Sequence, residues 1–271
     1  MHNAATLHRH KPMTEPPLAN SVRAERHDPG WVAEFWRRMK RHLLLKFMGI
    51  SGFMWIFFIG YFHMLRHPVY PVTEMPLTAL DRLITFQPGA LIAYLTLWFY
   101  LGIAPSLLLS LRELVSYGLW VGGLCLVGLV CFYFWPTAVP VAVLGINSHP
   151  SFTVLQGVDA AGNACPSLHV ATAMFSALWL DHLLRTLRAP TAARVFNGCW
   201  FIAIAYSTLA IKQHVVVDVI AGLVLGLAFA LPSLRLRASF QGNAGPPPVS
   251  LLPEAGGSPQ SGSPAGPHHQ V

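Results

Sequence analysis

Two short stretches of the chain place ionisable and hydroxyl side chains in an otherwise apolar sequence. The first runs from Asn163 to His169 and ends in Pro-Ser-Leu-His. The second runs from Ser207 to Asp218 and contains His214. His214 and Asp218 are four residues apart, so at the start of a helix they share one face. A carboxylate bound to one imidazole nitrogen selects the tautomer of the ring and leaves the other nitrogen as a nucleophile or base.

The neighbouring residues add groups that bind anions. Pro166 and Ser167 are typical of a helix start, and a helix N-terminus presents free N–H groups and partial positive charge. Ser167, Ser207 and Lys212 contribute two hydroxyls and one cation. Two imidazoles, one of them beside a carboxylate, in such surroundings are suited to phosphoryl transfer.

The composition places these residues in a membrane protein. The chain has 271 residues, of which 54% are hydrophobic and 11% are charged, and its mean hydropathy is +0.49. Charged residues are too few to cover the surface of a soluble domain. The high share of hydrophobic residues excludes disorder for most of the chain. The four cysteines have neither the number of a disulfide scaffold nor a C-x-x-C spacing.

Six apolar runs predict an all-α polytopic membrane protein, a bundle of six transmembrane helices. The runs are Phe47–Leu65, Leu83–Leu111, Leu114–Trp135, a run from Pro166 to just before Asp181, Val195–Ile211 and Val215–Leu234. The aromatic residues of the first three runs are expected mainly to face lipid or the membrane interface. They include Trp55, Phe57, Phe58, Trp98, Phe99, Tyr100, Phe132 and Tyr133.

The basic residues predict the orientation. Nine of the 18 Lys and Arg precede residue 47, and six more fall in the loops on the same side of a six-span bundle. This asymmetry predicts that both termini are cytoplasmic and that both polar motifs lie at the outer face. The basic surplus therefore indicates contact with anionic lipid headgroups, and nucleic acid is not an expected partner.

The chain divides into three parts by composition. Residues 1–46 form a basic cytoplasmic segment, in which Trp31–Lys46 has the pattern of an interfacial amphipathic helix. Residues 47–237 form the six-span membrane domain, with the motif-bearing core at 80–230. Residues 238–271 are rich in Pro, Gly and Ser and are expected to be a disordered cytoplasmic tail. The first span has no cleavage site and is expected to be a retained signal-anchor, with a bacterial inner membrane as the expected location.

These motifs resemble a known family. Pro-Ser-Leu-His at 166–169 and S-x6-H-x3-D at 207–218 are similar to the second and third motifs of the type-2 phosphatidic acid phosphatase superfamily. The form of both motifs is most similar to the branch of inositol-phosphorylceramide synthases (inositolphosphotransferases) and their bacterial relatives. The resemblance covers about residues 80–230 and extends to Asp81, Pro88 and Tyr94. The superfamily's first motif, K-x6-RP, is absent, and Thr208 stands where that family commonly has arginine.

The resemblance implies a metal-independent enzyme without a cofactor that acts in two steps on a phosphorylated lipid. His214 would attack phosphorus and form a phosphohistidine, with Asp218 orienting the ring. His169 would protonate the leaving alcohol and then activate the acceptor. The phosphoryl oxygens would be bound by Ser167, Ser207 and Lys212. The acceptor is water in phosphatases and a lipid or sugar hydroxyl in phosphotransferases.

Several alternatives stay open at this point. Hydrolysis is preferred over transfer because the sequence identifies no second substrate pocket. The pair His214 and Asp218 could instead relay protons in a transporter, or form a structural ion pair in the bundle. A scaffold without activity is a further alternative, because the first motif is missing. The expected partners are a lipid phosphate and membrane lipids, and the oligomeric state is open.

Overall fold

The computed structural model describes residues 30–140 and 163–242, with side chains described as far as residue 237. The described chain is mostly helical, with one pair of two-residue strands. Its elements are α1 (Trp31–Lys40), α2 (Leu43–Arg66), β1 (Thr73–Glu74), α3 (Ala79–Leu83), α4 (Ala90–Ser106), α5 (Leu111–Phe134), β2 (Thr137–Ala138), α8 (Leu168–Thr186), α9 (Thr191–Ala210) and α10 (Val216–Gly242).

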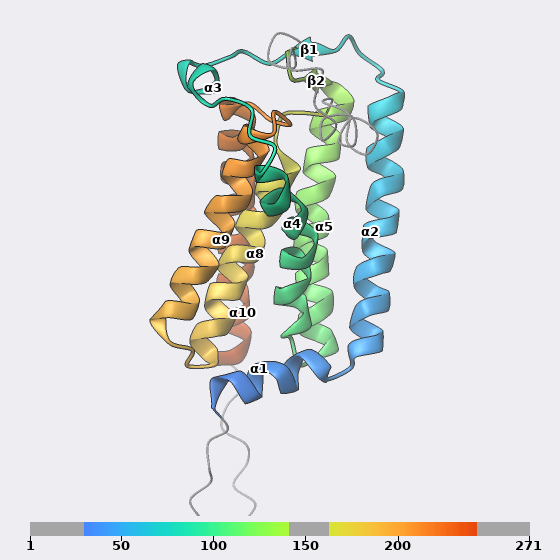
Figure 1. Cartoon of the computed structure of the whole chain (residues 1–271). Coiled ribbons are helices and arrows are strands. Elements are labelled where there is room, and N and C mark those ends of the chain that lie inside the picture. Colours follow the sequence, from blue (N-terminus) through green and yellow to red (C-terminus); the bar gives the residue numbers. More distant parts are fainter. Residues whose placement is uncertain (1–29, 141–162, 243–271) are drawn as a thin grey trace, which may run out of the picture.

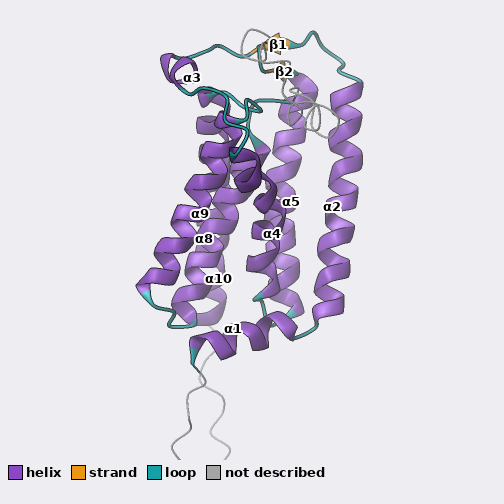
Figure 2. Ribbon diagram, viewed as in Figure 1, coloured by secondary structure: helices purple, strands orange, loops and turns teal. Residues whose placement is uncertain are grey.

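The long helices stand side by side as a bundle. As Figure 1 shows, α2, α4, α5, α8, α9 and α10 run up and down in alternation, and α1 lies across one end. The short helix α3 and the parallel pair β1–β2 lie at the opposite end, among the loops (Figure 2). We call these the α1 end and the α3 end. The C-terminal part of α10 returns to the α1 end, so the described chain begins and ends on the same side of the bundle.

Three helices in the described part of the chain are long and apolar enough to cross a membrane. They are Leu43–Arg66, Leu111–Phe134 and Val216–Arg237. The helix α4 is apolar but shorter than a typical span. The structure therefore agrees with a helical membrane protein, and the count of six spans stays a prediction.

The lower hydropathy of α8 has a structural reason. Twelve of its 19 residues are buried, and it contacts α4, α5, α9 and α10. A helix in the centre of a bundle meets protein on all sides, so it can carry small and polar residues that lipid would exclude. The hydroxyl of Ser176 lies 3.2 Å from that of Tyr117, and the indole of Trp179 donates to Ser233 at 2.9 Å.

Glycines allow α10 to approach α8 closely. Gly222 and Gly226 are spaced as in the G-x-x-x-G motif of packed membrane helices. An ideal Cβ on Gly222 would lie 2.5 Å from the backbone oxygen of Ser167. A Cβ on Gly226 would lie 2.6 Å from the backbone oxygen of Ala171. Any side chain at these two positions would therefore push the first two turns of α8 away from α10.

The second apolar run is not one helix. The prediction placed a span at Leu83–Leu111, whereas the structure has α4 only from Ala90 to Ser106. Pro88 lacks an N–H and Gly89 follows it, so the helix starts after this pair. At the other end Ser110 begins the next helix, because its hydroxyl accepts from the N–H of Glu113 at 3.2 Å.

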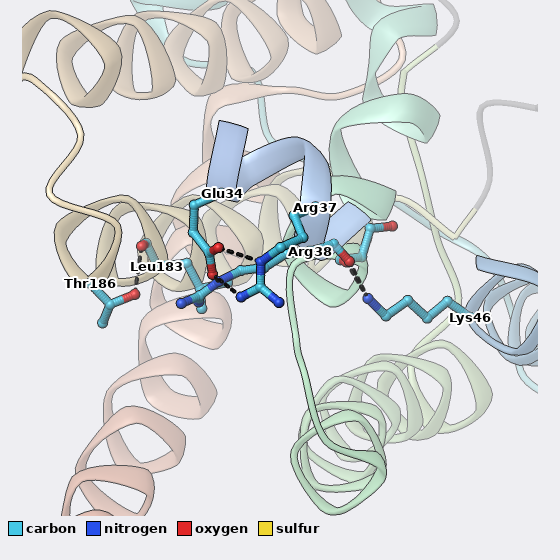
Figure 3. Close-up of polar contacts among 7 residues, drawn as sticks. Glu34, Arg37, Arg38, Lys46, Leu183 and Thr186 are labelled. Carbon is cyan, nitrogen blue, oxygen red and sulfur yellow. Dashed lines mark hydrogen bonds and ion pairs between the residues drawn. The ribbon is translucent and has the colours of Figure 1, made fainter. Parts of the chain in front are cut away.

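The predicted amphipathic helix at Trp31–Lys46 is also divided. The helix α1 ends at Lys40, and α2 starts at Leu43 after His42, whose φ of 55° is left-handed. Lys46 therefore belongs to α2. Its buried ammonium donates to the backbone oxygens of Arg38 at 2.9 Å and Ser106 at 2.5 Å, which connects α1, α2 and the end of α4. Figure 3 shows the Lys46 side chain extended toward Arg38.

An ion-pair cluster stabilises α1 itself. The carboxylate of Glu34 accepts from Arg37 at 2.6 Å and from Arg38 at 2.7 Å, as Figure 3 shows. These hydrogen bonds lower the pKa of Glu34 to about 2. Lys40, the remaining basic residue of α1, is exposed at this end of the bundle, as expected for a helix that lies on an anionic lipid surface.

The expectation that the aromatic residues face lipid was wrong for two of them. Trp55 and Phe99 are 70% and 64% exposed, as the prediction required. Tyr100, however, is fully buried and donates to the side-chain oxygen of Asn197 at 2.7 Å. Phe132 is also buried, in the main core. A buried hydroxyl needs a partner, and Asn197 on α9 supplies one for Tyr100.

The close packing of α8 on α10 gives a first prediction. Replacing Gly222 by Ala places a methyl group against a backbone oxygen that cannot move, so we expect a loss of about 1–3 kcal/mol of stability. Thermal unfolding in detergent measures this loss. The control is Gly198→Ala on α9, where a Cβ meets no atom within 4 Å. Equal melting temperatures for the two variants would contradict the proposed packing.

Candidate active site

The two motif histidines meet at the α3 end of the bundle. His169 lies in the first turn of α8, and His214 lies in the turn between α9 and α10. The Nδ1 atom of His169 is 3.2 Å from the Nε2 atom of His214, and the ring centroids are 5.4 Å apart. The structure thus brings together two imidazoles that are 45 residues apart in the sequence.

The sequence predicted that His214 lies at the start of a helix, but it lies in the turn before α10. The helix α10 begins at Val216, because the chain turns sharply after α9. Lys212 has a left-handed φ of 61°, and the N–H groups of Gln213 and His214 both donate to the backbone oxygen of Thr208. This turn aims the His214 ring at α8.

The contact between His214 and Asp218 is nevertheless present. The Oδ2 atom of Asp218 lies 3.6 Å from the Nδ1 atom of His214, and the Asp218 side chain is fully buried. The same oxygen accepts from the N–H of Val215 at 3.0 Å. Asp218 is thus in the third position of α10 and bonds back to the residue before the helix, as the acidic member of a capping box does. The carboxylate serves the helix end and the histidine together.

Tyr94 of α4 contacts the other side of His169. Its hydroxyl lies 2.8 Å from the Nε2 atom of His169. The ring of Trp98, one turn further along α4, meets the His169 ring edge to face at a centroid distance of 6.2 Å. Both nitrogens of His169 therefore lie beside a polar partner, one from α4 and one from the turn before α10.

These contacts form one chain with a consistent direction. At 3.6 Å the Asp218 carboxylate is beyond hydrogen-bond distance of the Nδ1 atom of His214, so in this arrangement it acts on the ring through its proximity. With its proton on Nδ1, the His169 ring donates to the Nε2 atom of His214 at 3.2 Å. The Nε2 atom of His169 in turn accepts from the hydroxyl of Tyr94. One tautomer of His169 thus satisfies both of its contacts, with Tyr94 and with His214.

Ser167 connects the two helices that carry this chain. Its hydroxyl caps α8 by accepting from the N–H of Val170 at 3.3 Å. Its backbone N–H donates to the backbone oxygen of Asp218 at 3.1 Å. Since its own backbone oxygen lies against Gly222, Ser167 fixes the distance between the start of α8 and the first turns of α10.

The Ser207 hydroxyl is directed into its own helix. It donates to the backbone oxygen of Ile204 at 2.6 Å and is fully buried. Thr208 behaves in the same way, since its hydroxyl donates to the oxygen of Ala205 at 2.8 Å. The proton of Ser207 is therefore used inside α9 in this arrangement, and not for the phosphoryl contact predicted from the sequence.

Lys212 is directed toward α3. Its ammonium donates to the backbone oxygens of Asp81, at 3.1 Å, and Ile84. Burial lowers the pKa of Lys212, and the nearby Asp81 carboxylate partly opposes this shift. Two of its three N–H groups thus hold the end of α3, which leaves one for the phosphoryl contact predicted from the sequence.

Asp81 is a second buried carboxylate that positions the turn. Its Oδ1 atom accepts from the N–H of Val216, the first residue of α10, at 2.8 Å. Its Oδ2 atom accepts from the N–H of Thr78 at 2.8 Å and from the Thr78 hydroxyl at 2.7 Å. Asp81 and Lys212 together attach α3 to the turn that carries His214.

Sequence spacing did not predict the contacts of Tyr94 and Asp81. Tyr94 is 75 residues from His169, and Asp81 is 135 residues from Val216. Both residues were noted only because the resemblance extends to them. The available signal was the general one that ionisable and hydroxyl groups at the end of an apolar run need partners.

Within residues 30–140 and 163–242, no group of three or more His, Cys, Asp or Glu is arranged to hold a metal ion. Cys165 is next to the site, before Pro166. Burial and the Asp218 carboxylate raise the pKa of its thiol to about 11, so the thiol stays protonated at neutral pH.

One comparison with known proteins gives a match. The family model described as the PAP2 superfamily matches residues 140–241, a segment that contains His169, His214 and Asp218. Neither the curated proteins nor the solved structures gave a match. Members of this superfamily are membrane-type phosphatases and phosphotransferases. The match therefore supports the resemblance that the motifs indicated: residues 140–241 are similar to the PAP2 superfamily. Together with the three long apolar helices, it supports a membrane protein.

Proposed function

We propose that this protein is an integral-membrane phosphatase that removes the phosphoryl group of a lipid phosphate through a phosphohistidine on His214. One observation carries the proposal. A buried carboxylate, two imidazoles and a phenol from four segments of the chain form a continuous series of contacts beside the N-terminus of α8. Such a series can activate a nitrogen nucleophile and move a proton next to a bound anion.

Binding of the substrate separates the two histidines. At 3.2 Å the contact between their nitrogens leaves no room for a phosphoryl group, so the phosphoryl group enters between the rings. The Nε2 lone pair of His214 is then free to attack phosphorus. The P–N bond forms as the P–O bond to the lipid breaks, and its electron pair goes to the departing oxygen. Nδ1–H of His169 protonates that oxygen, and Asp218 stabilises the positive charge on His214.

The second step returns the enzyme to its starting state. His169, now without the Nδ1 proton, removes a proton from water as the water oxygen attacks phosphorus. The P–N bond breaks, and its electron pair returns to His214. An alcohol in place of water would give transfer, which is the reaction of the inositol-phosphorylceramide-synthase-like alternative. No metal ion enters either step.

Tyr94 is a positioning residue in this mechanism. In the proposed mechanism the Tyr94 hydroxyl, 2.8 Å from Nε2 of His169, donates to that nitrogen, which places the exchangeable proton of the ring on Nδ1, the nitrogen that faces His214. A ring with the proton on the other nitrogen could not deliver it to the leaving group.

We infer that the site faces the side of the membrane opposite to the cytoplasm. The basic helix α1 and the C-terminal part of α10 lie at one end of the bundle, and α8, whose first turn contains His169, begins at the other. Arg37, Arg38 and Lys40 are all at the α1 end, and basic residues favour the cytoplasmic side. This arrangement supports cytoplasmic termini and an outward site, with a bacterial inner membrane as the proposed location.

The first test is release of inorganic phosphate from lipid phosphates by the purified chain in detergent. We expect turnover with EDTA present, complete loss of turnover in His214→Ala, and a loss of about 100-fold or more in Asp218→Asn. The control is His63→Ala on α2, which is exposed and outside the chain of contacts. Loss of turnover on adding EDTA would contradict the metal-free mechanism, and proton flux in liposomes without turnover would favour a transporter.

The covalent intermediate gives a second test. An aryl phosphate has a leaving group that needs no proton, so the first step proceeds in His169→Gln while the second step stalls. We expect labelled phosphate to accumulate on this variant, and mass spectrometry at alkaline pH should locate it on His214. His214→Ala should carry no label. Label on any other residue would exclude His214 as the nucleophile.

The role of Tyr94 gives a third test. Removing the hydroxyl in Tyr94→Phe should lower kcat roughly fivefold, the value of about 1 kcal/mol for one hydrogen bond, and leave KM unchanged. Tyr100→Phe is the matched control, because it removes a buried hydroxyl from the same helix that bonds to Asn197 and not to the site. This control should lose stability and keep kcat. An equal fall of kcat in both variants would show a merely structural role for Tyr94.

A further inference from the structure

A long apolar cavity leads away from the proposed active site. It has a volume of about 800 Å³ and lies between α2, α4, α5 and α8. His169, Tyr94 and Leu168 line it toward the α3 end, and Leu45, Pro105 and Leu111 line it toward the α1 end. The cavity therefore runs between the helices from a reacting histidine to their far ends, and it is partly open where exposed residues such as Leu95 and Val115 line it.

The wall of this cavity presents hydrocarbon. Most of its lining residues are Leu, Phe and other apolar types. The polar side chains in its middle section bond to protein partners: the hydroxyl of Thr172 donates to the oxygen of Leu168 at 2.7 Å, and those of Tyr117 and Ser176 pair with each other. A polar or hydrated ligand would find few hydrogen-bond partners there, whereas an apolar chain has no hydrogen bonds with water to give up.

The length of the cavity fits a lipid tail. At a rise of about 1.5 Å per residue, the stretch of α4 from Leu91 to Pro105 is about 21 Å long. The tails of one leaflet extend through about 15 Å, half of a hydrocarbon core of ~30 Å. An ordinary membrane tail would thus fit along the cavity over its whole length.

We propose that this cavity binds the hydrocarbon tail of the lipid phosphate that reacts at His169 and His214, and that it selects substrates by tail length. The proposal rests on the proposed function, because the headgroup and the tail belong to one molecule. His169 is the shared residue: its Nδ1 faces the phosphoryl position, and its ring is part of the cavity wall.

Glycines keep the part of the cavity near the α1 end open. Gly49, Gly102 and Gly118 come from three different helices, line the cavity, and have no atom within 4 Å of an ideal Cβ. Gly102 is eight residues beyond Tyr94 on α4, about 12 Å toward the α1 end. A large side chain at Gly102 would close the cavity at that depth and shorten the tail that fits.

The test compares hydrolysis of hexyl phosphate and hexadecyl phosphate in mixed detergent micelles at equal mole fraction. For the unmodified protein, we expect a higher kcat/KM for the longer substrate. In Gly102→Phe the ratio of long to short should fall tenfold or more, since displacing two methylene groups from an apolar site costs roughly tenfold. The control is Gly198→Phe on α9, which also points into open space and is outside the cavity. An unchanged ratio in Gly102→Phe would overturn the proposal.

A second measurement does not depend on turnover. Hexadecyl phosphate with a photoreactive diazirine at the tail end is bound to His214→Ala and irradiated. Adducts on buried residues of the cavity wall, such as Pro105, Tyr117 or Val121, would support the cavity as the tail site. Adducts on lipid-facing residues such as Trp55 and Phe99, with phosphate release by the unmodified protein intact, would overturn the tail site alone. Adducts in the cavity without phosphate release from any substrate would instead overturn the proposed phosphatase function.

Discussion

The site depends on the close approach of α10 to α8. Gly222 has no side chain where the backbone oxygen of Ser167 lies, and the N–H of Ser167 donates to the backbone oxygen of Asp218. These two contacts set the first turn of α8 against the first turns of α10. His169 and Asp218 are on those turns, and His214 lies just before α10. A shift of either helix by the width of a methyl group would separate the groups that the proposed chemistry needs to keep together.

Burying these polar groups costs free energy, so other groups must stabilise the arrangement. Two carboxylates, from Asp81 and Asp218, accept the N–H groups of Val216 and Val215, which the start of a helix leaves without partners. Lys212 then binds the backbone oxygens at the end of α3. The sequence motif around His214 therefore has two functions. Some of its polar residues face the histidines, and others hold the turn in place.

The cavity and the site share a wall, which connects lipid recognition to chemistry. Tyr94 and Trp98 of α4 contact the ring of His169. Further along α4, the same face of the helix lines the apolar cavity. The opposite end of the bundle is held by Lys46, which joins α1, α2 and the end of α4. The bundle thus combines a polar site at one end with an apolar interior, and a basic surface at the other end.

Much of this protein could be predicted from local sequence. Apolar runs of sufficient length predict the helices α2, α5 and α10, because hydrocarbon excludes unpaired backbone groups and charge. The positions of the two polar motifs, at the same end of the predicted bundle, together with the family resemblance, indicated that His169, His214 and Asp218 meet.

The tertiary structure decided what local patterns do not contain. It divided the second apolar run at Pro88 and Ser110, directed the Lys212 ammonium to α3 and the Ser207 hydroxyl to its own helix, and placed Tyr94 beside His169. The physical reason is that a polar side chain bonds to whichever partner packing places within about 3 Å. Residues 75 or 135 positions apart become such partners only when the helices are packed.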